Sequence, residues 1–193
     1  MREFIYFSKN ARTSGNFDLN NLMKAGRMDI ACQIMIMSFF VSHHTREDVK
    51  LHLVFNGAPD PPKHIEIRVT PDLEISKKDI GNLIKKILYK YKKEEKKEVF
   101  PGCFVEKKSF LKVIEELHEE GKEIFILDKK GKDIRKEEIK DESVFVLGDH
   151  EGLPRKELRR IRKIATPISI GTKIYFASQV VAILNNELDR RGV

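Results

Sequence analysis

The chain has 193 residues, of which 40% are hydrophobic and 35% are charged. This length suffices for one large domain or two small ones with a buried core, and only 11 glycines and 7 prolines argue against disordered and fibrous classes. The 37 lysines and arginines exceed the 30 acidic residues and leave a formal net charge of +7, which favours a polyanionic partner such as RNA.

The cysteine content and the apolar stretches bear on the compartment. Cys32 and Cys103 are too few for a disulfide framework or a four-cysteine zinc site. The N-terminus lacks the basic segment and apolar run of a signal peptide. The longest apolar stretch, residues 30–41, is far short of the roughly 20 residues that a membrane span needs. We therefore expect a cytoplasmic protein that does not bind a membrane.

The N-terminal half predicts a strand, a long loop, a helix and a pair of strands. A β-type run at residues 3–7 leads into a segment rich in Ser, Asn and Gly at 8–26, whose length is typical of a functional or mobile loop. An apolar helix is expected at 29–42. Alternating runs at 49–55 and 64–69 predict a hairpin-like pair.

The C-terminal half alternates helices and strands. A capping box at Ser76–Asp79 predicts a basic helix to about residue 92, and the Lys/Glu tract at 91–98 reads as its solvated end. A helix is expected at 110–120, between Ser109 and Gly121. Two further helices are expected at 154–164, with Pro154 in first position, and at 176–191. The expected strands are 123–127, 143–147 and 168–170. This alternation predicts one α/β domain over residues 1–193, with a mostly parallel sheet and flanking helices.

Common nucleotide and hydrolase motifs are absent. The sequence contains no P-loop, no G-x-G-x-x-G after a strand and no G-x-S-x-G elbow. Four histidines lie close together in the sequence, namely His43, His44, His52 and His64. Their spacing matches no zinc pattern, so we interpret them as surface or hairpin histidines and expect no metal site.

Three strand ends in the C-terminal half run directly into loops. They lie at residues 126–128, 147–154 and 169–172. Ligands of open α/β sheets bind outside the carboxyl ends of strands, so we expect these loops to converge on one pocket. Gly148, Gly152 and Gly171 would let backbone amides approach a ligand, although each glycine by itself is also explained by a tight turn.

Two blocks of sequence resemble a known family. VFVLGDHEGLP at 144–154 and ISIGTKIYFASQVVAILNNELDR at 168–190 resemble the cofactor-binding half of the SPOUT methyltransferases, which fold their C-terminus into a trefoil knot. FDLNNLMKAGRMDIACQ at 17–33, with the Asn-Gly-Ala-Pro loop at 56–59, resembles the archaeal tRNA pseudouridine N1-methyltransferase (TrmY) family. The resemblance covers essentially the whole chain and implies a SPOUT fold with its knot within about residues 121–193.

The resemblance also implies S-adenosylmethionine (SAM) as methyl donor, with its adenine held by backbone groups of the three loops. Carried over by position, the cofactor-binding residues are Leu127, Gly148, Asp149, His150, Glu151, Gly152, Leu153, Ser169, Ile170, Gly171, Ile174, Tyr175, Ala177 and Val180. Some relatives carry a cysteine where this chain has Val180, so a thiol cannot act there in this protein.

The implied reaction is SAM-dependent N1-methylation of pseudouridine at position 54, in the T-loop of tRNA. Pseudouridine carries a free N–H at the acceptor nitrogen, and this proton must leave. Our hypothesis is that Asp18 or Asp29 accepts the proton or a hydrogen bond from the base, with Arg27 orienting it. The alternative is that Asp29 is only a helix N-terminal charge and Asp18 only a loop cap.

RNA binding requires a basic surface beside the pocket. The predicted RNA-binding residues are Arg12 in the N-terminal loop and Arg155, Arg159, Arg160 and Arg162 in the helix after the Gly148 loop. The lysine-rich tract at 77–97 is interpreted as mostly a solvated face.

The last helix has an apolar arc wider than that of an ordinary surface helix. The resembled family is dimeric through this helix, so we expect a homodimer, and a fully internal helix is the alternative.

Two other functions stay open. One is N1-methylation of an rRNA pseudouridine by a related SPOUT family. The other is a non-enzymatic basic RNA-binding module, which saturable SAM binding would exclude.

Overall fold

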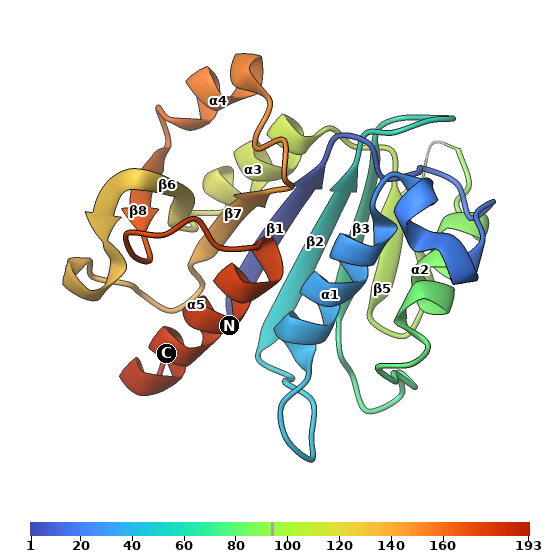
Figure 1. The fold of residues 1–193 in the computed structure, drawn as a ribbon, viewed down its shortest axis with the longest axis horizontal. Helices are drawn as coiled ribbons and strands as arrows, with labels where there is room; N and C mark the ends of the chain where they lie inside the picture. Colours follow the sequence, from blue (N-terminus) through green and yellow to red (C-terminus); the bar gives the residue numbers. More distant parts are fainter. Residues whose placement is uncertain (94) are drawn as a thin grey trace.

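The computed structural model describes residues 1–93 and 95–193, which build one eight-stranded sheet with helices on both faces (Figure 1). The strands are β1 (Arg2–Ser8), β2 (Val49–Phe55), β3 (Lys63–Arg68), β4 (Lys97–Phe100), β5 (Cys103–Glu106), β6 (Ile124–Asp133), β7 (Val144–Gly148) and β8 (Ala165–Ser169), in the order β4-β5-β3-β2-β1-β7-β6-β8. β1, β2, β7, β6 and β8 pair in parallel, whereas β3, β5 and β4 add an antiparallel end. The prediction of an α/β fold with a mostly parallel sheet is confirmed.

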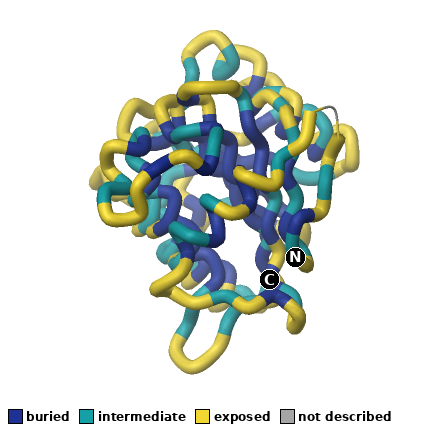
Figure 2. The backbone as a smooth tube through the Cα atoms, turned by 90° about the vertical axis from the view of Figure 1, so that its right-hand side faces the viewer, coloured by how far each residue is buried: buried dark blue, intermediate teal, exposed yellow. Residues whose placement is uncertain are grey.

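The two faces of the sheet carry separate sets of helices. The helical elements are η1 (Leu19–Ala25), α1 (Met28–Phe39), α2 (Ile80–Tyr89), α3 (Phe110–Glu119), η2 (Ile134–Lys136), α4 (Arg155–Ile161) and α5 (Ala177–Arg191). Because successive side chains of a strand point to opposite faces, Phe4 and Tyr6 of β1 join the core under α1, α2 and α5, while Ile5 and Phe7 join the core under α3 and α4. Figure 2 shows the buried strands enclosed by exposed loops. None of the helices in the described ranges is long and apolar enough to cross a bilayer.

Several predicted helix boundaries differ from the structure. α2 begins at Ile80 with Asp79 as N-cap, so the capping box at Ser76 is wrong: the Asp79 N–H donates to the Ser76 carbonyl at 2.9 Å and closes a turn before the helix. α4 is shorter than predicted, and Pro154 is its N-cap rather than its first residue. The cap at Ser109 is confirmed, because its Oγ accepts from the Lys112 N–H at 3.3 Å.

The Lys/Glu tract does not extend a helix. α2 ends at Tyr89, and the end of the tract begins β4, which pairs with β5 across a turn at Pro101 and Gly102. Gly102 has φ +70°, and a Cβ there would lie 2.2 Å from the Arg68 carbonyl oxygen. This Pro-Gly pair between two apolar runs was a turn signal that the prediction overlooked. Glu94, which belongs to the tract predicted as a helix end, lies outside the described residues.

The N-terminal loop at 8–26, predicted as functional or mobile, is packed against the hairpin loop. Its later part forms η1, and Ala11 and Thr13 are buried. A Cβ on Gly57 would lie 2.2 Å from the Asn10 carbonyl oxygen, and one on Gly26 only 1.7 Å from the same atom. Both glycines are therefore needed for the chain at Asn10 to pass between them.

Candidate functional site

A cavity of about 830 Å³ opens at the carboxyl ends of β6, β7 and β8, beside the first turn of α5. Its size lies within the range of small-molecule sites. Every predicted cofactor-binding residue lines it, namely Leu127, Gly148, Asp149, His150, Glu151, Gly152, Leu153, Ser169, Ile170, Gly171, Ile174, Tyr175, Ala177 and Val180. The three loops, which are far apart in sequence, thus converge as the topology predicted.

A further wall of the cavity contains Arg27, which the sequence predicted to orient the base, and two residues that it did not predict, Ile30 and Gln33. These three residues line it from the start of α1. Residues three positions apart on a helix lie on the same face. The spacing of Ile30 and Gln33 from Arg27 therefore indicates that all three face the same side. Asp128, Lys129 and Lys173 add charged groups from the loops.

The Gly148 loop folds back on itself. The Gly152 N–H donates to the Asp149 carbonyl at 2.9 Å, and Gly152 has φ +78°. A Cβ on Gly148 would lie 2.6 Å from the Gly152 carbonyl carbon. The loop therefore requires glycine at both ends of the turn, and its backbone borders the cavity.

Side chains bind this loop to the N-terminal loop. The Asp149 carboxylate is buried and accepts from Ser8 Oγ at 3.1 Å, from the Lys9 N–H at 3.0 Å and from the Glu151 N–H at 2.8 Å. The Glu151 carboxylate accepts from Lys9 Nζ and Asn10 Nδ2. The hydrogen bond between Lys9 and Glu151 raises the pKa of the lysine and lowers the pKa of the carboxyl.

The third loop presents apolar side chains at the rim. Ile174 is 88% exposed and Phe176 77%, while Tyr175 is 38% exposed. Exposed apolar side chains beside a cavity are typical of a surface that a ligand or a partner covers.

The structure separates the two candidate carboxylates. Arg27 adopts a left-handed conformation at φ 65° and holds Asp29 with two parallel bonds, Nε to Oδ1 at 3.0 Å and Nη2 to Oδ2 at 2.9 Å. Hydrogen bonding to Asp29 raises the pKa of Arg27. A non-glycine residue held in the left-handed region raises the energy of the backbone by about 1–3 kcal/mol. Residues strained in this way cluster at functional sites.

Neither Asp18 nor Asp29 is among the described residues that line the cavity, and Asp18, unlike Asp29, has no hydrogen bond to a residue of its wall within the described part of the chain. The exposed Asp18 carboxylate accepts from the Asn20 N–H at 2.9 Å and caps η1. The loop-cap interpretation therefore accounts for Asp18, whereas Asp29 is within direct reach of a residue of the cavity wall.

The cysteine thiols take no part in this site. Burial raises the pKa of Cys32 and of Cys103 to about 12 in each case. Neither thiol is ionised at neutral pH, and only the thiolate is a good nucleophile.

The predicted RNA-binding arginines differ in their surroundings. Arg155 and Arg159 are exposed on α4, which lies above the carboxyl edge of the sheet (Figure 1). Arg160 pairs with Glu115 at 2.7 Å, and Arg162 pairs with Asp128, a cavity residue, at 2.9 Å. Arg12 is half-buried, and its buried Nε has no hydrogen-bond partner among the described residues.

The last helix is only partly internal. Val181, Leu184 and Leu188 are fully buried against the core that includes α1. In contrast, Asn186 of the same helix is exposed, and three of its apolar residues are only partly buried, namely Val180, Ala182 and Ile183. Next to the helix, Phe176 at its N-cap and Met37 on α1 are 77% and 41% exposed.

Comparisons with known proteins show the family and the fold of the chain. The family described as SAM-dependent RNA methyltransferases matches residues 1–193. The tRNA (pseudouridine(54)-N(1))-methyltransferase of Methanococcoides burtonii is 35% identical, covering 98% of this chain and 96% of its own. The protein of the same name from Pyrococcus abyssi is 34% identical over 100% of both chains. The crystal structure of Archaeoglobus fulgidus Nep1 bound to S-adenosylhomocysteine has a TM-score of 0.65 at 14% identity, over 100% of this chain and 99% of that one, which shows a common fold.

Proposed function

The chain belongs to the family of SAM-dependent RNA methyltransferases, and we propose that it methylates N1 of pseudouridine 54 in tRNA. The observation that carries this proposal is the cavity at the strand ends, which all the residues assigned to the cofactor line. Full-length relatives named for this reaction support the choice of substrate. A tRNA substrate also fits the cytoplasmic location expected from the sequence.

The residues of the cavity fit SAM. Apolar walls from Leu127, Ile170 and Val180 suit an adenine ring. The backbones of Gly148 and Gly152 approach so closely that a Cβ on Gly148 would force them apart, so the loop borders the cavity with its backbone. The Gly148–Leu153 and Ser169–Gly171 segments would hold the cofactor. When bound, SAM supplies an electrophilic methyl group on a sulfonium.

Arg27 and Asp29 are the groups we assign to the acceptor base. Arg27 lines the cavity and orients the ring, while the Asp29 carboxylate, held by Arg27, accepts the proton of the N1–H. Positioning supplies most of the acceleration, because it makes the attack effectively unimolecular. The base adds about 10²–10⁴-fold. Asp18 is the weaker candidate, since its carboxylate caps η1 outside the cavity.

Arg155 and Arg159 are assigned to tRNA phosphates. Both are exposed on α4, directly after the Gly148 loop, where a bound polyanion would pass the mouth of the cavity. Arg160 and Arg162 stay in the proposed surface, although each has a carboxylate partner that RNA would have to replace. Arg12 would contact RNA from the N-terminal loop.

The proposal includes a homodimer through α5 and α1. Its support is the exposed apolar side chains of Phe176 and Met37, which a partner subunit would bury. Sedimentation analysis should give a dimer for the natural protein and a monomer for Met37→Lys. A monomeric natural protein at micromolar concentration would contradict this part.

We also propose that residues 1–193 are one SPOUT domain, with a trefoil knot within about residues 121–193. One continuous sheet and the common fold with a solved relative support it. A crystal structure traced through this segment tests the knot directly.

The function is tested by incubating the protein with isotopically labelled SAM and either tRNA or rRNA from a strain lacking the modification. Label in N1-methylpseudouridine at tRNA position 54 is expected. Label only in rRNA would instead favour the related rRNA reaction. Absence of saturable SAM binding in calorimetry would leave only an RNA-binding module.

A further inference from the structure

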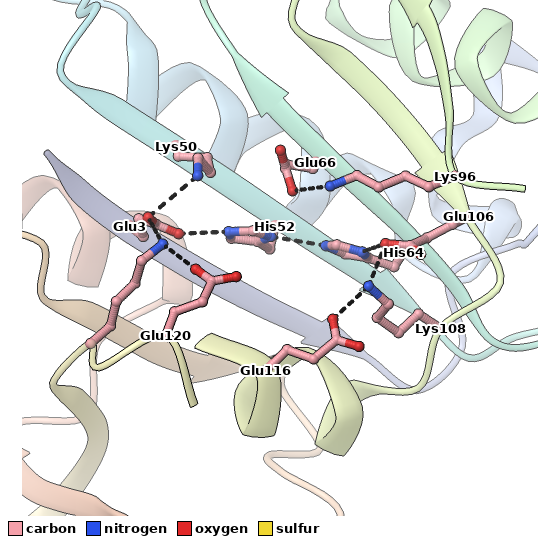
Figure 3. A network of polar contacts seen from close by, with 11 residues as sticks. Glu3, Lys50, His52, His64, Glu66, Lys96, Glu106, Lys108, Glu116 and Glu120 are labelled. Carbon is pink, nitrogen blue, oxygen red and sulfur yellow. Dashed lines mark hydrogen bonds and ion pairs between the residues drawn. The ribbon is translucent and has the colours of Figure 1, made fainter. Parts of the chain in front are cut away.

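Two histidines lie in contact on the sheet face opposite α1, away from the cavity. His52 of β2 and His64 of β3 are 2% and 3% exposed, and Figure 3 shows their rings edge to edge between carboxylates. His52 Nδ1 and His64 Nε2 are 2.9 Å apart. Neither residue lines the cavity of the proposed reaction.

Both outer ring nitrogens already have acceptors. His52 Nε2 lies 2.9 Å from Glu3 Oε2, and His64 Nδ1 lies 2.9 Å from Glu106 Oε1. A neutral imidazole has a single N–H. If each ring donates its N–H to its carboxylate, the inner nitrogens meet as two lone pairs. A metal ion between the rings, or a proton shared by the two nitrogens, would remove this repulsion.

A third candidate ligand lies close to the two rings. Glu66 is directly opposite His52 in the β2–β3 register, and one ligand atom from each of His52, His64 and Glu66 lies within 4.8 Å of the other two. Two imidazoles and a carboxylate form a donor set that Zn²⁺ accepts. Metal-bound histidines almost always donate their other N–H to a carboxylate or carbonyl, which is the part that Glu3 and Glu106 play here.

Ion pairs surround the two histidines. Within the described residues, ion pairs link five carboxylates (Glu3, Glu66, Glu106, Glu116 and Glu120) to five ammonium groups (Lys50, Lys96, Lys108, Lys112 and Lys122), and Figure 3 shows most of this network. Carboxylates and ammonium groups are therefore equal in number around the two histidines.

We propose that this cluster binds one divalent transition metal ion, with His52 Nδ1, His64 Nε2 and a Glu66 carboxylate oxygen as ligands. Zn–N bonds of about 2.0–2.1 Å at a tetrahedral angle place two nitrogens about 3.3 Å apart, so the rings must part by about 0.4 Å. Lys96 Nζ lies 2.8 Å from Glu66 Oε2, and its side chain, which is 41% exposed, has room to move if the metal binds that oxygen. The metal would join β2 to β3 and leave the cavity untouched.

The test uses tag-free, full-length protein that has been treated with a chelator and dialysed. Zn²⁺ is titrated in competition with a chromophoric chelator, and Co²⁺ serves as a spectroscopic probe. We expect one equivalent bound and the visible bands of tetrahedral Co²⁺, with water as the fourth ligand beside the three side chains. His64→Gln should abolish binding. Glu66→Gln, which keeps both histidines and their carboxylates, should weaken it at least tenfold, since loss of even an outer partner costs 10–100-fold.

The control is the double variant His43→Gln with His44→Gln, which removes two exposed histidines and should leave the stoichiometry unchanged. Circular dichroism verifies that each variant is folded, and Glu66→Gln provides the decisive comparison if His64→Gln is not. The proposal is overturned if the natural protein binds no Zn²⁺ at micromolar concentration, in which case a shared proton joins the rings. It is also overturned if folded Glu66→Gln binds as tightly as the natural protein. Because no step measures methyl transfer, the result is independent of the proposed function.

Discussion

Ser8 and Asp149 are 141 residues apart in the chain, and the Ser8 hydroxyl donates a hydrogen bond to Asp149 Oδ2 at 3.1 Å. The same carboxylate oxygen accepts from the Lys9 N–H, and Oδ1 accepts from the Glu151 N–H. One buried side chain thus joins the N-terminal loop to the loop that borders the cavity. The shape of the cavity therefore depends on a contact that neither loop makes alone.

Replacing Asp149 should loosen this loop. Each hydrogen bond to a charged group stabilises the folded loop by about 1.5–3 kcal/mol. If SAM binding must supply this free energy to order the loop again, the loss of one bond corresponds to about ten- to hundredfold in SAM affinity. We expect Asp149→Ala to weaken SAM binding by at least that range in isothermal calorimetry. Asp141→Ala, at an exposed loop position, is the matched control. A folded Asp149→Ala protein with unchanged affinity would show that the loop is held in other ways.

Gly148→Ala should also weaken SAM binding, because its Cβ would lie 2.6 Å from the backbone of Gly152 and must displace the loop. The control is Gly121→Ala. Gly121 has φ +86°, and a Cβ there would meet no atom within 4 Å, so this change adds backbone strain without steric contact. We expect calorimetry to give a large loss of affinity only for Gly148→Ala. Equal affinities would mean that the loop adjusts without cost.

Asp29→Ala and Asp18→Ala separate the two candidate bases. We expect the first change to lower turnover on tRNA by about 10²–10⁴-fold, the usual range for a general base. The second should leave turnover close to natural and lower stability by about 0.5–2 kcal/mol through loss of the η1 cap. Single-turnover kinetics and urea unfolding measure the two effects. Unchanged turnover in both variants would remove the carboxylate from the mechanism.

Replacing Arg155 and Arg159 together by alanine should weaken tRNA binding and make it less sensitive to salt. Each lost phosphate contact lowers the slope of log affinity against log salt by about 0.7–0.9. Filter binding at several salt concentrations measures this slope. The paired change Lys78→Ala with Lys92→Ala, at exposed positions of the lysine tract, should have a smaller effect. Equal losses in both double variants would indicate diffuse attraction rather than a binding surface on α4.

Asp189 should make stability depend on pH in the acid range. Its carboxylate accepts from Arg46 and from Arg2 Nη1, the latter at 2.9 Å, and so ties α5 to β1. The hydrogen bond from Arg46, followed by that from Arg2, lowers the pKa of Asp189 below its ordinary value of 3.8 despite partial burial. This contribution is complete above pH 3.8 and is lost as the pH falls through the lowered pKa.

Asp189→Asn should therefore be less stable than the natural protein at pH 7, and the difference should shrink below pH 3.8. Urea unfolding at pH 7 and pH 3 measures the difference, with Asp72→Asn as an exposed control. A gap that stays constant between the two pH values would mean that the charge of Asp189 does not contribute.

The local pattern of the sequence determined the elements, the mostly parallel sheet and the loops that border the cavity. Each of these rests on neighbours a few residues apart: alternation within a strand, a serine before a helix at Ser109, glycines in the turn from Gly148 to Gly152. Where such a local signal was overlooked, as at Pro101 and Gly102, two strands were missed.

Only the tertiary structure decided which distant groups meet. It placed Arg27, but not Asp18, on the cavity wall, and it put His52 beside His64 across two antiparallel strands. The spacing of these residues along the chain does not encode their distance in space, because that distance depends on which strands become neighbours and in which register. Such contacts follow from the packing of the whole sheet, which no short stretch of sequence contains.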